Sequence, residues 1–416
     1  MNATKMEFYK TPNAMEPLFP DGEIRLLEKL AIELIEKSNK LEGTMNPFTR
    51  KAVSDFLRPM NSYYSNLIEG HDTHPIDIAK ALKNDYSSDK IKRDLQLEAL
   101  AHIQLHKALT EEITSSESEL IPTTSDFLKR LHFRFYEHLP EEFKLVKSIE
   151  NIEKHVIPGE YRNDEVKVGR HIAPYSGSIE LFMERFETFY NPKNIENSSK
   201  IKRIISIAAS HHRLAWIHPF LDGNGRVVRL YSDACFLYEK LDAVGLWSIS
   251  RGLARRNTDY KAKLANADLR RYNDYDGRGN LSNKMLLEFC VFFLETSIDQ
   301  VNYMYEVLDK EHMLSRINGF VDLMVVRKKL RPEARYILED LFLKGKITKT
   351  DVERITNLSE KTAKIITDSL EQLELVRKTK EGIHVTFHVN YPVNLSPFFF
   401  PGIYPSSAEA EMMRLL

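Results

Sequence analysis

The sequence predicts a mostly α-helical protein that carries a short β-hairpin and ends in a small mixed module. Apolar residues recur at helical spacing over most of the 416 residues. Residues 166–168 alternate between apolar and polar side chains, and so do residues 376–380 and 382–389. Alternation with a period of two is typical of strands. Helices should therefore build the molecule, with a hairpin near its middle and a β-ribbon near its end.

The helical periodicity divides the chain into four parts. The predicted helices cover residues 24–38, 48–57, 62–69, 91–115, 125–138, 178–190, 201–217, 224–240 and 284–308. A Ser/Thr/Glu-rich stretch before Pro122 is typical of a linker. Three short helices, 335–343, 349–356 and 359–375, then precede the ribbon, an order typical of a winged helix. The predicted parts are 1–122, a catalytic core at 123–310, a winged-helix module at 311–390 and a tail at 391–416.

The composition excludes several classes of protein. Lys and Arg number 59 and Asp and Glu number 60, so no global positive charge attracts nucleic acid or an anionic membrane. Cys235 and Cys290 are the two cysteines, which fits a reducing compartment. No apolar run reaches the roughly 18 residues of a membrane helix, and residues 1–10 have no signal-peptide pattern. These features predict a cytoplasmic protein with no membrane partner.

Residues 218–229, with the sequence HPFLDGNGRVVR, combine the groups needed for chemistry on a polyphosphate. A glycine-rich turn that opens a helix directs several free backbone N–H groups at one anion. Arg226 and Arg229 lie three residues apart and share a helix face toward that anion. Asp222 beside phosphate calls for a divalent cation between them, and Mg²⁺ suits one carboxylate plus phosphate oxygens. His218 can take up a proton near neutral pH.

This segment resembles the Fic family signature, H-P-F-x-(D/E)-G-N-G-R-x-x-R, at every specified position. The resemblance extends over about residues 125–300 and implies a Fic-type helical core. It also implies a protein adenylyltransferase, which moves AMP from ATP to a Tyr, Thr or Ser hydroxyl of a target protein. The implied roles are His218 as the base, Asp222 as the Mg²⁺ ligand, Gly223, Asn224, Gly225, Arg226 and Arg229 as nucleotide ligands, and Arg162, Val166, Lys167 and Val168 as the target-docking flap.

An upstream segment, residues 62–70, resembles the inhibitory helix of the same family. Ser65 and Glu69 lie four residues apart on one helix face, and Gly70 is a suitable C-cap. These residues fit the pattern (S/T)-x-x-x-E-(G/N). The resemblance implies that Glu69 pairs with Arg229 and blocks the γ-phosphate position, so the enzyme inhibits itself. In some members of the family the same glutamate supports removal of AMP.

Other functions stay open at this stage. A nucleotide-sensing DNA-binding regulator is one alternative, and a Fic enzyme that uses another nucleotide donor or removes AMP is another. The predicted recognition helix, 360–374, carries two lysines against four acidic residues, whereas a helix that reads DNA is basic. Binding of DNA is therefore not favoured over binding of protein. Dimers are common in the Fic family, so a homodimer is one expected assembly.

Overall fold

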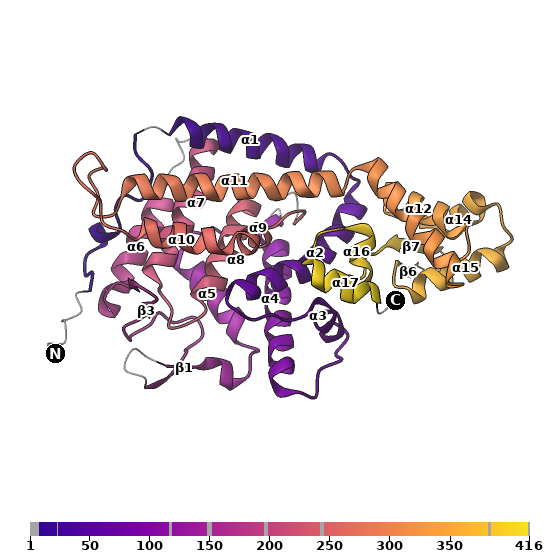
Figure 1. Cartoon of the computed structure of the whole chain (residues 1–416), viewed down its shortest axis with the longest axis horizontal. Coiled ribbons are helices and arrows are strands. Elements are labelled where there is room, and N and C mark those ends of the chain that lie inside the picture. Colours follow the sequence, from indigo (N-terminus) through magenta and orange to yellow (C-terminus); the bar gives the residue numbers. More distant parts are fainter. Residues whose placement is uncertain are drawn as a thin grey trace.

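A computed structural model describes residues 8–22, 24–115, 119–147, 152–194, 199–241, 245–381 and 384–414. Helices dominate this part of the chain, and the strands are short (Figure 1). The predicted fold class, mostly α, is confirmed. Residues 382 and 383, at the start of the predicted run 382–389, lie outside the described residues.

The elements are numbered in chain order. The helices are α1 (Arg25–Glu42), α2 (Pro47–Ile68), α3 (Pro75–Ala81), α4 (Lys90–Thr114), α5 (Ser125–Tyr136), α6 (Ile179–Tyr190), α7 (Lys200–Ile217), α8 (Asn224–Tyr238), α9 (Ile249–Arg255), α10 (Asn257–Ala267), α11 (Asn283–Val307), α12 (Lys310–Val326), α13 (Ala334–Lys344), α14 (Lys349–Thr356), α15 (Glu360–Gln372), α16 (Ser396–Phe399) and α17 (Ser406–Arg414). The strands are β1 (Leu145–Lys147), β2 (Glu153–His155), β3 (Lys167–Val168), β4 (His171–Ile172), β5 (Lys346–Thr348), β6 (Val376–Glu381) and β7 (His384–Val389).

Helix α2 corrects one prediction, because the two helices expected at 48–57 and 62–69 are a single helix. Pro59 lies inside it and removes one backbone hydrogen bond, which ordinarily breaks a helix. The side chains of residues 56–66 are all buried, so tertiary packing surrounds the helix at this point. Burial of this kind supplies most of a helix's stability in a folded protein and here offsets the local cost.

Helices α7 and α8 form the centre of the molecule. Nearly every side chain of both helices is buried. They pack on each other, α6 and α11 also cover α7, and α4 and α5 cover α8. Helix α1 lies alongside α11 at the top of the view in Figure 1. The loop between α7 and α8 is residues 218–223, so the predicted chemical motif lies where the two most buried helices meet.

The predicted hairpin after residue 159 is present. Strands β3 and β4 pair antiparallel, with Lys167 opposite Ile172 and Val168 opposite His171. The Ala173 N–H donates to the Val166 carbonyl at 3.2 Å and extends the pairing by one step. Lys167 and Val168 are exposed, and Val168 retains 47% of its surface.

The C-terminal segment has the predicted order of elements. Helices α13, α14 and α15 are followed by β6 and β7, and β5 adds a third strand in the order β5-β7-β6. Assignment of this segment to the winged-helix class stays a prediction. Helix α12 was not expected from the sequence, although its buried residues do recur at helical spacing.

The tail is structured and packs on α2. Residues 393–414 contain α16 and α17, which lie beside α2 and α3 in Figure 1. Phe400 is fully buried and stacks on Phe56 with ring centroids 4.5 Å apart. The Tyr64 hydroxyl donates to the Ile403 carbonyl at 2.9 Å. The tail therefore belongs to the core that surrounds α2.

Candidate active site

The motif loop begins at a residue in an unusual backbone conformation. Helix α7 ends at Ile217, and His218 takes the left-handed conformation, with φ 51° and ψ 59°. Few residues other than glycine adopt it, and such strain gathers at functional sites. Gly223 also has a positive φ, 77°, immediately before α8. A Cβ at Gly223 would lie 2.8 Å from the Tyr136 ring, so the loop is tightly packed there.

Phe220 and Asn224 close the loop on itself. The Phe220 N–H donates to Asn224 Oδ1 at 2.9 Å, and Asn224 Nδ2 donates to the Phe220 carbonyl at 2.8 Å. Phe220 is fully buried and stacks on His132 with centroids 4.0 Å apart. Asn224 was predicted to bind nucleotide, and its side chain is already engaged within the loop. Its backbone N–H at the start of α8 is the group that faces an anion in such a turn.

Helix α5 supports the loop through two residues that the sequence analysis missed. His132 Nδ1 accepts from the Gly159 N–H at 2.8 Å, so its Nε2 donates to the Asp222 carbonyl at 3.2 Å. Burial lowers the pKa of His132 to about 4, which keeps the ring neutral. The Tyr136 hydroxyl donates to Asp222 Oδ2 at 2.7 Å. Together they fix the carboxylate predicted to hold Mg²⁺.

The environment of His218 keeps its imidazole neutral. Burial, and then electrostatic interactions with His171 and the Arg162 guanidinium, lower the pKa of His218 to about 3. Its carbonyl accepts from Arg162 Nε at 2.8 Å. A neutral imidazole is the form that can accept a proton. The predicted base therefore has the right protonation state at neutral pH.

Arg162 lies at the base of the predicted flap and faces inward. Its side chain is fully buried and donates to three carbonyls, those of His218, Asp164 at 2.9 Å and Pro174 at 2.6 Å. It ties the hairpin to the motif loop and does not itself reach the surface. Target docking by residues 166–168 stays a prediction.

The predicted partners of Arg229 are in contact with it. Arg229 Nη2 lies 2.6 Å from Glu69 Oε1 and donates to the Ser65 carbonyl at 2.9 Å. Its Nε donates to Ser65 Oγ at 3.0 Å. The Arg229 side chain is 1% exposed and that of Glu69 is 33% exposed. Gly70 has φ 91° and ends α2, with the His71 N–H donating back to the Asn66 carbonyl at 3.0 Å.

The Glu69 carboxylate rests directly on the glycine-rich turn. A Cβ placed on Gly225 would overlap Glu69 Oε1 and lie 3.2 Å from Arg229 Nη1. The carboxylate thus lies against the backbone that opens α8, where an anion is favoured. Burial raises the pKa of Glu69, but Arg229 and then Arg226 lower it further, so the pKa lies below its ordinary value. Glu69 is therefore charged and occupies an anion position.

The first motif arginine, Arg226, has a partner that the sequence did not reveal. Arg226 Nη1 forms an ion pair with Glu98 Oε1 of α4, and Nη2 lies 3.3 Å from Asp222 Oδ2. Glu98 is fully buried. Its other oxygen, Oε2, is 2.6 Å from His71 Nδ1. Both motif arginines are thus paired with carboxylates from the N-terminal helices.

The other histidines of α7, His211 and His212, pack and form hydrogen bonds within the core. His211 is fully buried and contacts the Ser232 and Tyr260 hydroxyls, each at 2.7 Å. His212 Nε2 lies 3.1 Å from the Leu264 carbonyl. Among the described residues no group of three or more His, Cys, Asp or Glu side chains is arranged to hold a metal. A metal at Asp222 would therefore need ligands from a substrate or water.

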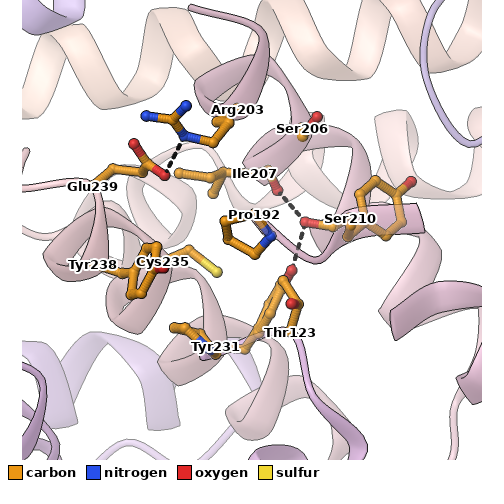
Figure 2. Close-up of a pocket in the computed structure, with 12 residues that line it drawn as sticks. Thr123, Pro192, Arg203, Ser206, Ile207, Ser210, Tyr231, Cys235, Tyr238 and Glu239 are labelled. Carbon is orange, nitrogen blue, oxygen red and sulfur yellow. Dashed lines mark hydrogen bonds and ion pairs between the residues drawn. The ribbon is translucent and has the colours of Figure 1, made fainter. Parts of the chain in front are cut away.

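A separate cavity lies along α7 and α8, away from the motif loop (Figure 2). The Tyr231 hydroxyl donates to Ser210 at 2.8 Å, and Ser210 donates to the Ile207 carbonyl at 3.0 Å. Arg203 and Glu239 neutralise each other at 2.8 Å. These contacts leave little charge for a phosphate group. The motif loop remains the candidate active site.

Comparison with known proteins gives the class of this site. Residues 122–235 match the profile of the Fic/DOC family. An 86-residue stretch, 20% of this chain, is 46% identical to "Protein adenylyltransferase Fic" of Drosophila melanogaster and 43% identical to that of Drosophila virilis. The chain spans about a sixth of the length of these curated relatives, since 17% of each is covered.

Solved structures agree on the fold. A Fic family protein from Desulfovibrio desulfuricans G20 superimposes with a TM-score of 0.51 and 15% identity, over 89% of this chain and 98% of that one. A Fic domain containing signalling protein from Bacteroides thetaiotaomicron gives 0.50 and 20%, over 67% and 96%. These likenesses show a shared fold, in which the motif loop lies between α7 and α8. The Fic/DOC family match covers residues 122–235, which include the motif loop.

No helix in the described part of the chain combines the length and the apolar character needed to cross a membrane.

Proposed function

We propose that this chain is a protein adenylyltransferase that moves AMP from ATP to a hydroxyl of a target protein and is inhibited by its own Glu69. The observation that carries the proposal is the position of the Glu69 carboxylate. It pairs with Arg229 at 2.6 Å and lies against Gly225, on the turn where a phosphate would bind. The relatives named as adenylyltransferases support the choice of AMP transfer.

The residues of the loop suit an in-line transfer. The target hydroxyl oxygen attacks the α-phosphorus, the bond between that phosphorus and the bridging oxygen breaks, and pyrophosphate leaves. A ring nitrogen of His218 receives the hydroxyl proton. Asp222, held by Tyr136, would bind Mg²⁺, which offsets charge on the phosphates when it is bound. Arg226 and Arg229 would neutralise the phosphates that depart.

The depressed pKa of His218 fits a base that becomes stronger with its substrate. Without nucleotide, burial and the electrostatic interactions with His171 and Arg162 hold the pKa of His218 near 3. Triphosphate brings negative charge into the same loop, and negative charge nearby raises the pKa of an imidazole. The histidine then approaches the range in which a general base works best at neutral pH.

Inhibition by Glu69 follows from competition between its carboxylate and the γ-phosphate of ATP for one binding position. A γ-phosphate would bind the Arg229 guanidinium and the glycine-rich turn. The Glu69 carboxylate already contacts both of these groups. Like charges at such distances repel strongly in a site of low dielectric. ATP can then bind productively only after Glu69 has moved away. The end of α2 is thus the switch in this proposal.

The test uses α-labelled ATP with Mg²⁺ and four forms of the chain. Glu69→Gly should raise label on protein about tenfold or more, because the competing carboxylate is gone. Adding His218→Ala to Glu69→Gly should lower transfer by about 10²- to 10⁴-fold. The matched control is Glu42→Gly, since Glu42 also precedes a glycine at the end of a helix and pairs with Arg50 at 2.8 Å, away from the motif.

The outcomes separate the parts of the proposal. If Glu69→Gly and Glu42→Gly label to the same extent as the unchanged chain, Glu69 is not a brake. Transfer that survives His218→Ala would remove His218 as the base. If label stays absent from every form, with cell lysate supplied as a source of targets, AMP transfer itself is wrong. Loss of label from a protein that had already been modified would instead favour AMP removal.

A further inference from the structure

We propose that Glu98 is a positioning residue for the Fic reaction, because it pairs with one side of the Arg226 guanidinium and limits that arginine to a single long contact with Asp222, the proposed Mg²⁺ ligand. This inference rests on the proposed function and adds a residue to it. The geometry that carries it is a short chain of contacts, His71 to Glu98 to Arg226 to Asp222.

Glu98 lies where a carboxylate is costly. It occupies the middle of α4 and is fully buried. A buried charge persists only when it is paired and hydrogen-bonded. Both oxygens of Glu98 meet this condition, since Oε1 pairs with Arg226 Nη1 and Oε2 is 2.6 Å from His71 Nδ1. The side chain is therefore fixed at both of its oxygens.

His71 completes the arrangement as a neutral donor. Burial and then the charge of Arg226 lower the pKa of His71, while Glu69 and Asp222 oppose the shift. A neutral ring that faces a carboxylate donates through the facing nitrogen, so Nδ1 carries the hydrogen. This contact leaves the negative charge of Glu98 for Arg226.

Arg226 lies between two carboxylates that both attract its guanidinium. On one side is Glu98, and on the other is Asp222, four residues earlier in the chain, with its Oδ2 3.3 Å from Nη2. The Phe135 ring lies 4.9 Å from the guanidinium and closes a third side. The Arg226 side chain is 8% exposed, so no solvent takes the place of a missing partner.

Removing Glu98 therefore has a specific consequence. Arg226 would keep a single carboxylate partner among these contacts, Asp222, and would move onto it. An arginine on that carboxylate competes with a divalent cation for the same oxygens. The guanidinium would also leave the position from which it meets phosphate. Loss of Glu98 should then weaken binding of the Mg²⁺–nucleotide complex more than binding of nucleotide alone.

The experiment measures binding, so that it does not depend on transfer. The background is Glu69→Gly, and the probe is a non-hydrolysable ATP analogue, titrated by calorimetry with Mg²⁺ and with EDTA. The added single changes are Glu98→Ala, Glu98→Gln and Asp222→Asn. Each of the two Glu98 changes is also combined with Asp222→Asn. Glu112→Ala is the matched control, because Glu112 lies on the same helix and pairs with Arg134 and Arg130, away from the loop.

In Mg²⁺, Glu98→Ala should raise the Kd about 10- to 100-fold, which corresponds to loss of a hydrogen bond between charged groups. The increase should be much smaller in EDTA and much smaller when Asp222 is already Asn. Glu98→Gln retains an acceptor for Arg226 and should fall between the parent and Glu98→Ala. Glu112→Ala should leave the Kd unchanged.

Other outcomes overturn the proposal. If Glu98→Ala and Glu98→Gln bind the analogue as the parent does, Glu98 does not position Arg226. If both weaken binding equally with Mg²⁺, with EDTA and in the Asp222→Asn background, Glu98 has only a structural role. If Glu98→Ala shows no cooperative thermal transition, it is not folded. The same comparisons made with Glu98→Gln then decide whether Glu98 positions Arg226. Failure of the proposed function would appear separately, as tight analogue binding in Glu69→Gly without any transfer of label.

Discussion

Two regions of the molecule use arginine ion pairs in opposite ways. At the motif helix, Arg226 pairs with Glu98, and their side chains are 8% and 0% exposed. In the C-terminal segment, Arg335 of α13 pairs with Asp322 of α12 at 2.6 Å, and these side chains are 28% and 64% exposed. The chemical groups are the same kind, and the difference between the pairs is the access of water.

The difference shows which charges report on function. Taking a charged group out of water costs several kcal/mol even after its surroundings relax, and pairing must offset that cost, whereas an exposed ion pair contributes about 0–1 kcal/mol. Burying two arginines and the Glu98 carboxylate around one loop is a poor way to stabilise a core. The buried set is thus best explained by what it does for a phosphate-bearing ligand. The exposed set needs no such explanation.

The largest expected effect comes from breaking the buried pair. Arg226→Met leaves Glu98 charged, buried and without its guanidinium, and should lower the free energy of unfolding by about 3–5 kcal/mol. Urea unfolding followed by circular dichroism measures this. The double variant Arg226→Met with Glu98→Leu should recover most of the loss, because an apolar pair needs no compensation. Equal loss in the single and double variants would show that the ion pair does not account for the effect.

A second expected effect uses pH to compare buried and exposed histidines. Burial, with a smaller contribution from Arg58, lowers the pKa of His106 to about 4, while an unfolded histidine titrates near 6.5. The unfolded chain therefore takes up this proton first as the pH falls. The stability that His106 contributes is complete above pH 6.5 and is lost as the pH falls toward 4.

Between pH 6.5 and 5 this loss amounts to about 2 kcal/mol for one such histidine. His106→Leu should flatten the dependence of unfolding free energy on pH by that amount. The control is His384→Leu on β7, where the side chain is exposed. The two variants would be compared by urea unfolding at several pH values. Parallel curves for His106→Leu and the unchanged chain would contradict the assignment.

The smallest expected effect is at the exposed pair. Arg335→Ala removes the contact with Asp322 and should change the free energy of unfolding by less than about 1 kcal/mol. AMP transfer in the Glu69→Gly background should be unaffected. A loss comparable with that of Arg226→Met would mean that burial of the side chains does not separate the two regions.

Candidate site residues that lie close together in the chain could be predicted from the sequence, because a motif specifies both the residue types and their spacing. The loop 218–229 and the segment that holds Ser65 and Glu69 were found in this way, and the structure brings Glu69 to Arg229. The roles given to these residues in catalysis stay predictions. The mostly helical fold followed from periodicity over long stretches.

What was missed depends on contacts between distant parts of the chain. Glu98 looks like one more glutamate in an amphipathic helix, and only the packing of α4 on α8 places it beside Arg226. His132 and Tyr136 are equally ordinary in sequence and gain their role from the approach of α5 to the loop. The continuity of α2 through Pro59 likewise comes from burial on every side, which no local pattern records.

The contact between Glu69 and Gly225 restricts how this sequence can change. A side chain at position 225 would overlap the glutamate carboxylate, so the two positions cannot vary independently. A substitution at 225 is sterically compatible with α2 in its present place only if residue 69 has first become small. Replacement of Glu69 by a smaller residue causes no overlap with Gly225 and so does not depend on a change there. In any lineage of such chains, replacement of the glutamate at position 69 by a smaller residue should come before replacement of the glycine at position 225.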